Sequence, residues 1–63
     1  METHFDEVMT VSEIAAFLKV PVSWVYERTR RTGIEKIPHV KLGKYLRFSA
    51  SEVKAWLLQQ REF

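Results

Sequence analysis

The chain has 63 residues and no cysteine, so one small domain is expected, and disulfides and thiolate metal sites are excluded. Its formal net charge of +2 results from 10 lysines and arginines and 8 acidic residues. No apolar run approaches a membrane span, and the acidic start METHFDEV does not resemble a signal peptide. We therefore expect a cytoplasmic, nucleoid-associated protein that does not interact with membranes.

The charges divide between two parts of the sequence. Residues 19–47 contain eight lysines and arginines against two glutamates, whereas the remaining positions contain two cationic residues against six acidic ones. A concentrated basic region attracts polyanions. The alternative is an ordinary solvated surface, which the grouping of these charges into one block makes the less favoured interpretation.

The first predicted helix covers residues 11–18. The stretch TVSE, residues 10–13, has the pattern of a capping box, in which the threonine hydroxyl accepts from a helix amide and the glutamate reaches back. Apolar residues then repeat at helical spacing. Pro21 lacks a backbone donor and disfavours helical geometry at the preceding residue, so the helix ends early.

A second helix is predicted over residues 22–31, because proline is favoured near a helix start and glycine, here Gly33, beyond a helix end. Its inward stripe is expected to contain Val22, Val25 and Thr29. The rotation of about 100° per residue then defines an outward face. This face consists of Ser23, Trp24, Glu27, Arg30 and Arg31, with Arg28 at its boundary. Two short helices joined by a tight turn are typical of a helix-turn-helix.

A β-hairpin is predicted within HVKLGKYLRF, residues 39–48, where apolar residues alternate with other residues on both sides of one glycine. A two-residue turn would pair Leu42 with Tyr45 and divide the apolar side chains between the two faces. We expect instead a three-residue loop that pairs Leu42 with Leu46, because this register keeps the apolar side chains on one face.

In the predicted register, Lys41 and Arg47 lie side by side on the solvent-exposed face, and Lys44 and Tyr45 project from the tip. Like charges opposite each other are mildly destabilising. A small domain that keeps them is expected to use them in binding. We therefore predict that the hairpin is a basic wing formed by Lys41, Lys44, Tyr45 and Arg47.

A C-terminal helix is predicted after the stretch SASE, residues 49–52, which has the pattern of a second capping box. One face of this helix carries Val53, Trp56, Leu57 and Gln60, and Trp56 is expected to be the large core residue. The predicted fold is mainly α with a small β-hairpin: a winged helix-turn-helix with a two-stranded wing and a C-terminal helix. Residues 1–8 are predicted to form a flexible tail, and residues 9–63 the domain.

The side chains that catalysis or metal binding require are absent or scattered. There is no cysteine nucleophile, and His4 and His39 have no recognisable ligand spacing. We therefore expect neither an enzyme nor a metal or cofactor site. The basic pattern favours double-stranded DNA, with the second helix in the major groove and the wing on the adjacent minor groove or phosphates.

The role of three residues on the second helix follows from what their side chains can do. Glu27 either accepts a hydrogen bond from a cytosine or pairs with a neighbouring arginine on the helix surface. Trp24 either packs at an edge of the core, which is the more frequent fate of tryptophan, or lies exposed near DNA. Arg31, near the helix end, is expected to contact a phosphate, which positions a protein without specifying sequence.

The ordered segments TVSEIAAFLKVP, SWVYERTRR, IPHVKLGKYLRF and SASEVKAWL resemble the excisionase family of winged helix-turn-helix DNA-binding domains, related to the MerR-type domain. The resemblance covers residues 9 to about 58. It implies DNA binding near phage or transposon attachment sites, DNA bending, cooperative self-association and assistance to an integrase in excision. By position, Ser23, Trp24 and Glu27 correspond to the recognition helix, and Lys44 and Arg47 to the wing.

The sequence leaves two other functions open as alternatives. Small AlpA-like relatives with this pattern are transcriptional regulators, which use DNA binding for a different purpose. A protein-interaction module is the third hypothesis, with Leu58 and Phe63 as its contact residues. The segregation of charge argues against this third hypothesis, and an affinity that does not change with salt would favour it.

Overall fold

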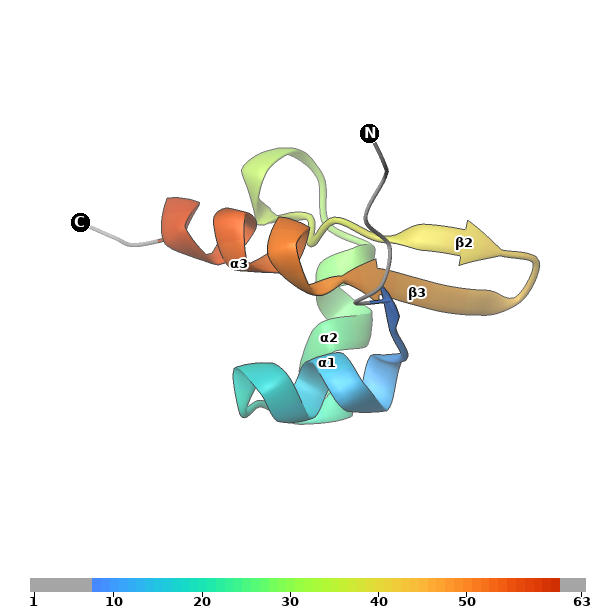
Figure 1. Cartoon of the computed structure of the whole chain (residues 1–63). Coiled ribbons are helices and arrows are strands. Elements are labelled where there is room, and N and C mark those ends of the chain that lie inside the picture. The colour runs from blue at the N-terminus through green and yellow to red at the C-terminus, as the bar shows by residue number, and fades with distance from the viewer. Residues whose placement is uncertain (1–7, 61–63) are drawn as a thin grey trace, which may run out of the picture.

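The computed structural model describes residues 8–60. Three helices and a three-stranded antiparallel sheet of order β1-β3-β2 make up this part of the chain, and the β2–β3 hairpin projects to one side of the helices (Figure 1). This is a winged helix-turn-helix, as predicted. In chain order the elements are β1 (Val8–Met9), α1 (Val11–Leu18), α2 (Val22–Thr29), the 3-10 helix η1 (Gly33–Glu35), β2 (Val40–Leu42), β3 (Tyr45–Ser49) and α3 (Ala50–Gln59).

The first described residues, Val8 and Met9, form a short strand. Val8, which the sequence pattern assigned to the tail, pairs with Ser49 in the sheet, and Met9 pairs with Phe48. The rest of the predicted tail and Phe63 lie outside the described residues. Within residues 8–60, every helix is too short and too polar to traverse a lipid bilayer.

Helix α1 has the predicted bounds and the predicted N-terminal cap. The Thr10 hydroxyl accepts from the Glu13 amide at 3.1 Å, and the Thr10 amide donates to the Glu13 carboxylate at 2.9 Å. The helix ends at Leu18, and the backbone of its C-cap, Lys19, adopts the left-handed conformation with φ of 61°. The Lys19 and Val20 amides donate to the last carbonyls of the helix, which starts the tight turn into α2.

Replacing Lys19 by glycine should stabilise the domain. The left-handed conformation costs a non-glycine residue about 1–2 kcal/mol, partly offset by the greater backbone entropy that glycine loses on folding. We expect the free energy of unfolding to rise by about 0.5–1 kcal/mol in urea denaturation. Lys54→Gly, in the middle of α3, should instead lower it by about 1 kcal/mol. Destabilisation by both substitutions would contradict the role assigned to the Lys19 backbone.

Helix α2 is shorter than predicted, because it ends at Thr29 and Arg30 is its C-terminal cap. The Ile37 amide donates to the Arg28 carbonyl at 3.2 Å, which draws the following chain back across the helix end. Ile37 is thereby fully buried in the core. Val25 faces inward as predicted, whereas Val22 is exposed.

The predicted three-residue hairpin loop is wrong. Leu42 pairs with Tyr45, Lys41 with Leu46 and Val40 with Arg47, so the turn has two residues. Gly43, the first turn residue, has φ of 62°. This is the conformation that two-residue hairpins of type II′ require, and their twist matches that of the flanking strands.

The consequence of this register is that the hairpin divides its apolar residues between two faces. Phe48 is buried and Leu46 is half-buried on the core side, whereas Val40 and Leu42 are 49% and 54% exposed. Lys41 therefore lies opposite Leu46 and not beside Arg47. The predicted juxtaposition of two cations on one face does not occur.

The core is formed where α1, α2 and α3 pack around β3. Its fully buried side chains are Ile14, Val25, Ile37, Phe48 and Val53. Trp56 is buried as predicted, and its indole Nε1–H donates to the Ile34 carbonyl at 2.8 Å. Leu57, predicted on the same face, is exposed. The second capping box is half formed, because only the Ser49 hydroxyl makes its contact, accepting from the Glu52 amide at 3.4 Å.

Candidate nucleic-acid interface

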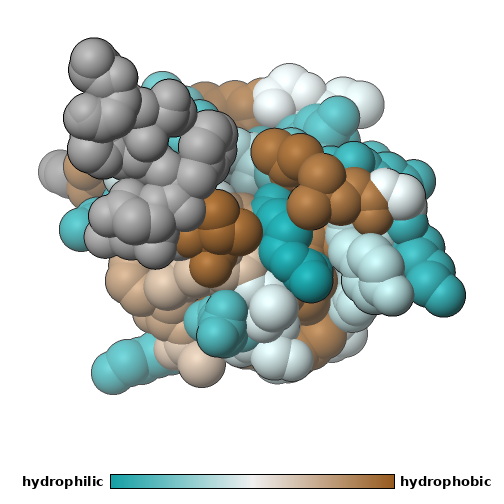
Figure 2. All heavy atoms as spheres, turned by 45° about the vertical axis from the view of Figure 1, so that its right-hand side comes forward, coloured by the Kyte–Doolittle hydropathy of each residue, from teal (hydrophilic) through white to brown (hydrophobic). Residues whose placement is uncertain are grey.

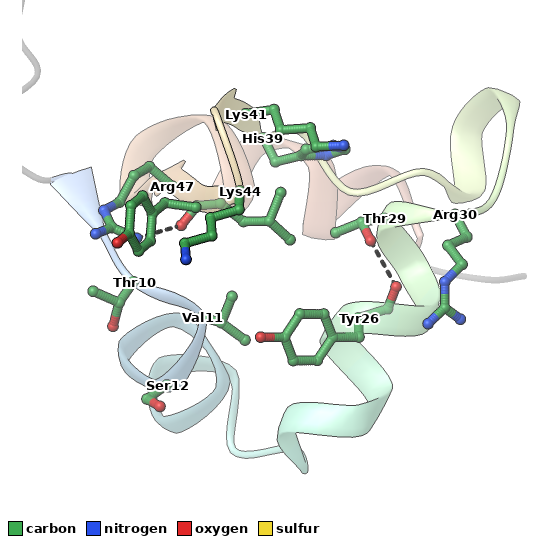
Figure 3. Close-up of a pocket in the computed structure, with 12 residues that line it drawn as sticks. Thr10, Val11, Ser12, Tyr26, Thr29, Arg30, His39, Lys41, Lys44 and Arg47 are labelled. Atoms are coloured by element: carbon green, nitrogen blue, oxygen red, sulfur yellow. Dashed lines mark hydrogen bonds between the residues drawn. The ribbon is translucent and has the colours of Figure 1, made fainter.

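An open groove of about 540 Å³ lies between α2 and the β2–β3 hairpin, with the start of α1 at one end (Figure 3). Among the described residues, no carboxylate lines it. Its neutral polar and aromatic lining includes Tyr26, Thr29, His39 and Tyr45. Its cationic lining consists of Arg30 from α2 and Lys41, Lys44 and Arg47 from the hairpin. The helix and the wing therefore contribute cations to one concave surface, which we call the basic groove.

On the α2 side of the basic groove, Tyr26 and Arg30 form a ridge. Both are exposed, and both also line a second cleft on the adjoining outward face of the helix. They are four residues apart and so share a helix face. Tyr26 was not among the predicted site residues.

On the wing side, the exposed ring of Tyr45 is flanked by two cations. The Lys44 ammonium lies 5.8 Å and the Arg47 guanidinium 5.5 Å from the ring centroid. Arg47 Nη1 also donates to the Leu46 carbonyl at 2.8 Å. Cation–π contacts at exposed sites contribute about 0.5–1 kcal/mol, enough to bias where these flexible side chains lie. In Figure 3 the Lys44 ammonium points into the basic groove.

His39 occupies the side of the basic groove nearest β2. Its Nδ1 lies 2.8 Å from the Ile37 carbonyl oxygen, which can only accept, so this nitrogen is the donor. Its ring packs at a tilt against Phe48, with 6.2 Å between centroids. These contacts give His39 a packing and hydrogen-bonding role.

Trp24 packs at the edge of the core, and part of it also lines the cleft beside Ser23 and Glu27. Its ring is half-buried and meets Trp56 edge-on, with centroids 6.3 Å apart. The core-edge alternative for Trp24 is therefore the one that the structure supports. The Arg28 guanidinium covers the same ring at 4.6 Å from its centroid. Arg28 is thus held by packing on the side of α2 that faces α3.

Arg31 is held between two carboxylates. Its Nη2 donates to Glu27 Oε2 at 3.0 Å, and its Nη1 donates to Glu35 Oε1 at 2.9 Å. The hydrogen bond from Arg31 and the nearby positive charge lower the pKa of Glu27, and the hydrogen bond to Glu27 in turn raises the pKa of Arg31. The predicted phosphate contact by Arg31 would therefore compete with two existing ion pairs.

The outer face of the sheet is the other exposed surface of the hairpin. A concavity of about 240 Å³ there is lined mainly by apolar side chains, among them Val8, Val40 and Leu42. Figure 2 shows apolar and hydrophilic surface side by side on the hairpin side of the molecule. This face is distinct from the basic groove, although Arg47 and His39 border both.

The structure therefore divides the predicted site residues into two groups. Arg30, Lys41, Lys44, Tyr45 and Arg47 surround the basic groove, and Ser23 and Glu27 lie on the adjoining outward face of α2. In the second group, Trp24 packs against Trp56 of α3 and Arg28 covers the Trp24 ring. Arg31 is paired with the carboxylates of Glu27 and Glu35.

A family model described as a helix-turn-helix domain matches residues 8–61 of the chain. Comparison with curated proteins and with solved structures gives no match. The matched range contains every element from β1 to α3.

Proposed function

Since the chain belongs to the helix-turn-helix domain family and is thereby a DNA-binding protein, we propose that it is a sequence-specific architectural protein of excisionase type. In this role α2 enters the major groove, and the hairpin wing contacts the adjacent minor groove and phosphates. The convergence of Arg30 with the wing cations around one groove that no described carboxylate lines is the observation that supports this proposal most directly.

The dimensions and chemistry of the interface support this assignment of roles. An α-helix such as α2 is about 10–12 Å across with its side chains, which fits the width of about 12 Å of the major groove. Arg30 and Ser23 have donors suited to base edges. Lys41 and Lys44 are suited to phosphates, which position the protein without specifying sequence.

A helix of two turns reads few base pairs. Useful specificity is therefore expected from several copies on adjacent sites, and the proposed partners are double-stranded DNA, further copies of this chain and an integrase. An assay of integrase-catalysed excision, with and without this chain, tests the architectural role. A change in transcript level without any change in excision would assign the chain to the AlpA-like regulators instead.

DNA binding by the basic groove should depend steeply on salt. With about four to six phosphate contacts, log affinity should fall against log salt with a slope of about −4 to −5. The measurement is a salt-titrated binding assay, with footprinting, on DNA surrounding the chain's own gene. An affinity that stays constant as salt rises would contradict the proposal and favour a protein-interaction module.

Arg30→Ala should relax base preference at one position of the target. A bidentate contact between arginine and guanine contributes about 1–3 kcal/mol of discrimination, and alanine cannot make it. Competition binding with single base-pair substitutions measures the effect. The matched control is Lys54→Ala on α3, whose side chain does not line the basic groove. Uniform weakening on every DNA sequence would show that Arg30 contacts a phosphate and not a base.

A further inference from the structure

We propose that Glu27 selects a cytosine at one position of the target, and that Arg31 and Glu35 hold its carboxylate in place for this contact. This inference rests on the proposed function and specifies how the same interface reads sequence. Glu27 is the reading residue, and the other two are positioning residues.

The location of Glu27 supports this role. Its side chain is 53% exposed and lines one cleft together with Ser23 and Arg30. With Val25 buried, these three residues occupy the side of α2 opposite the core. A helix that enters the major groove presents this side to base edges. Glu27 is also the one carboxylate within α2.

The Glu27 carboxylate is connected to the core through two ion pairs. Arg31 donates to Glu27 and to Glu35 at 3.0 and 2.9 Å. Glu35 ends η1, and this short helix is anchored because the Ile34 carbonyl accepts from Trp56 Nε1 at 2.8 Å and from Gln60 Nε2 at 2.9 Å. Arg31 and Glu35 therefore connect the Glu27 carboxylate to contacts that reach back to α3.

The hydrogen bonds of Glu27 leave it able to accept from a base. Only Oε2 receives the Arg31 hydrogen bond, and within residues 8–60 no other side-chain hydrogen bond reaches this carboxylate. The lowered pKa keeps Glu27 ionised at neutral pH. An ionised carboxylate can only accept, which suits the cytosine N4 amino group. It disfavours the acceptors of guanine, the O4 of thymine and adenine, whose N7 acceptor lies beside its N6 amino group.

A purely structural role explains the position of Glu27 less well. Exposed ion pairs contribute little to stability. A carboxylate on the surface that meets DNA is repelled by phosphates, so it reduces affinity unless it makes a favourable contact. A favourable contact with one particular base restores the affinity only on DNA that has this base at the contacted position. The residue thereby contributes to sequence specificity.

The test compares base preferences of three variants by selection from a randomised DNA library, followed by competition binding. In Glu27→Gln the preferred base at one position should change from cytosine to adenine, because glutamine pairs with adenine N6 and N7. The ratio of affinities for the two bases should change by about 5- to 150-fold. Glu35→Gln should keep the cytosine preference but weaken it.

Glu52→Gln is the matched control, since Glu52 is exposed at the start of α3 and its substitution removes the same charge away from the α2 surface. It should leave every base preference unchanged, and circular dichroism should show that all three variants fold. Identical preferences for Glu27→Gln and the parent chain would overturn the inference while leaving DNA binding intact. Absence of salt-dependent DNA binding by the parent chain would overturn the proposed function as well.

Discussion

Replacing Trp56 by alanine should remove about half or more of the free energy of unfolding of the domain. Removing a buried aromatic side chain costs about 3–5 kcal/mol. A domain of 63 residues has a total stability of only about 3–9 kcal/mol. Trp56 also donates to the Ile34 carbonyl and packs edge-on against Trp24, so its loss releases both η1 and one side of α2. Far-ultraviolet circular dichroism during urea denaturation measures the loss.

Leu58→Ala is the matched control for this prediction. Leu58 lies on the same helix but is 65% exposed, so its truncation should change the free energy of unfolding by about 0.5 kcal/mol or less. Trp56→Phe should fall between the two, because it keeps an aromatic ring but loses the indole donor. An unfolding midpoint of Trp56→Ala equal to that of the parent chain would contradict the assignment of Trp56 to the core.

The double variant Lys41→Gln, Lys44→Gln should lose both affinity and salt dependence on every DNA sequence. Each lysine that neutralises a phosphate contributes about −0.9 to the salt slope, so the slope should become less steep by about 1.8. At 0.1 M salt the affinity should fall about 10- to 100-fold. The salt titration already described measures both quantities, and base preference should be retained because these contacts carry no sequence information.

Lys19→Gln combined with Lys54→Gln changes the net charge by the same amount outside the basic groove. Both lysines are exposed, and neither lines the groove. This control variant should bind DNA with nearly the parent slope. An equal loss in both double variants would mean that overall charge, and not the geometry of α2 and the wing, governs binding.

The elements whose signals are local were predictable from the sequence. The Thr10–Glu13 capping box set the start of α1, and the pattern around Pro21 set the turn. The hairpin register was not predictable from the sequence. The prediction assumed that the wing has two strands and that all its apolar side chains lie on one buried face. The third strand, Val8–Met9, and the positive φ of Gly43 favour the two-residue turn instead.

The grouping of the cationic residues could be read from the sequence, but the contacts of each arginine could not. The block of cations predicted a basic surface on α2 and the hairpin, and cationic residues from both elements line the basic groove. Which guanidinium is paired depends on residues from other elements: Arg31 meets Glu35 of η1, and Arg28 covers Trp24, which packs against Trp56 of α3. The sequence allowed Glu27 to pair with a neighbouring arginine, but the second carboxylate on Arg31 became evident only in three dimensions.

Cleavage of DNA from single cysteines tests most directly whether α2 and the wing grip the same stretch of DNA. The chain has no cysteine, so Ser23→Cys and Lys44→Cys each provide one attachment point for an iron–EDTA reagent. Ser23→Cys should cut within the major groove of the bound site, and Lys44→Cys should cut about 5 base pairs away, near the adjacent minor groove. If Ser23→Cys cuts but Lys44→Cys leaves that site intact, the wing does not contact the DNA that α2 binds, and the convergence of their cations has no role in binding.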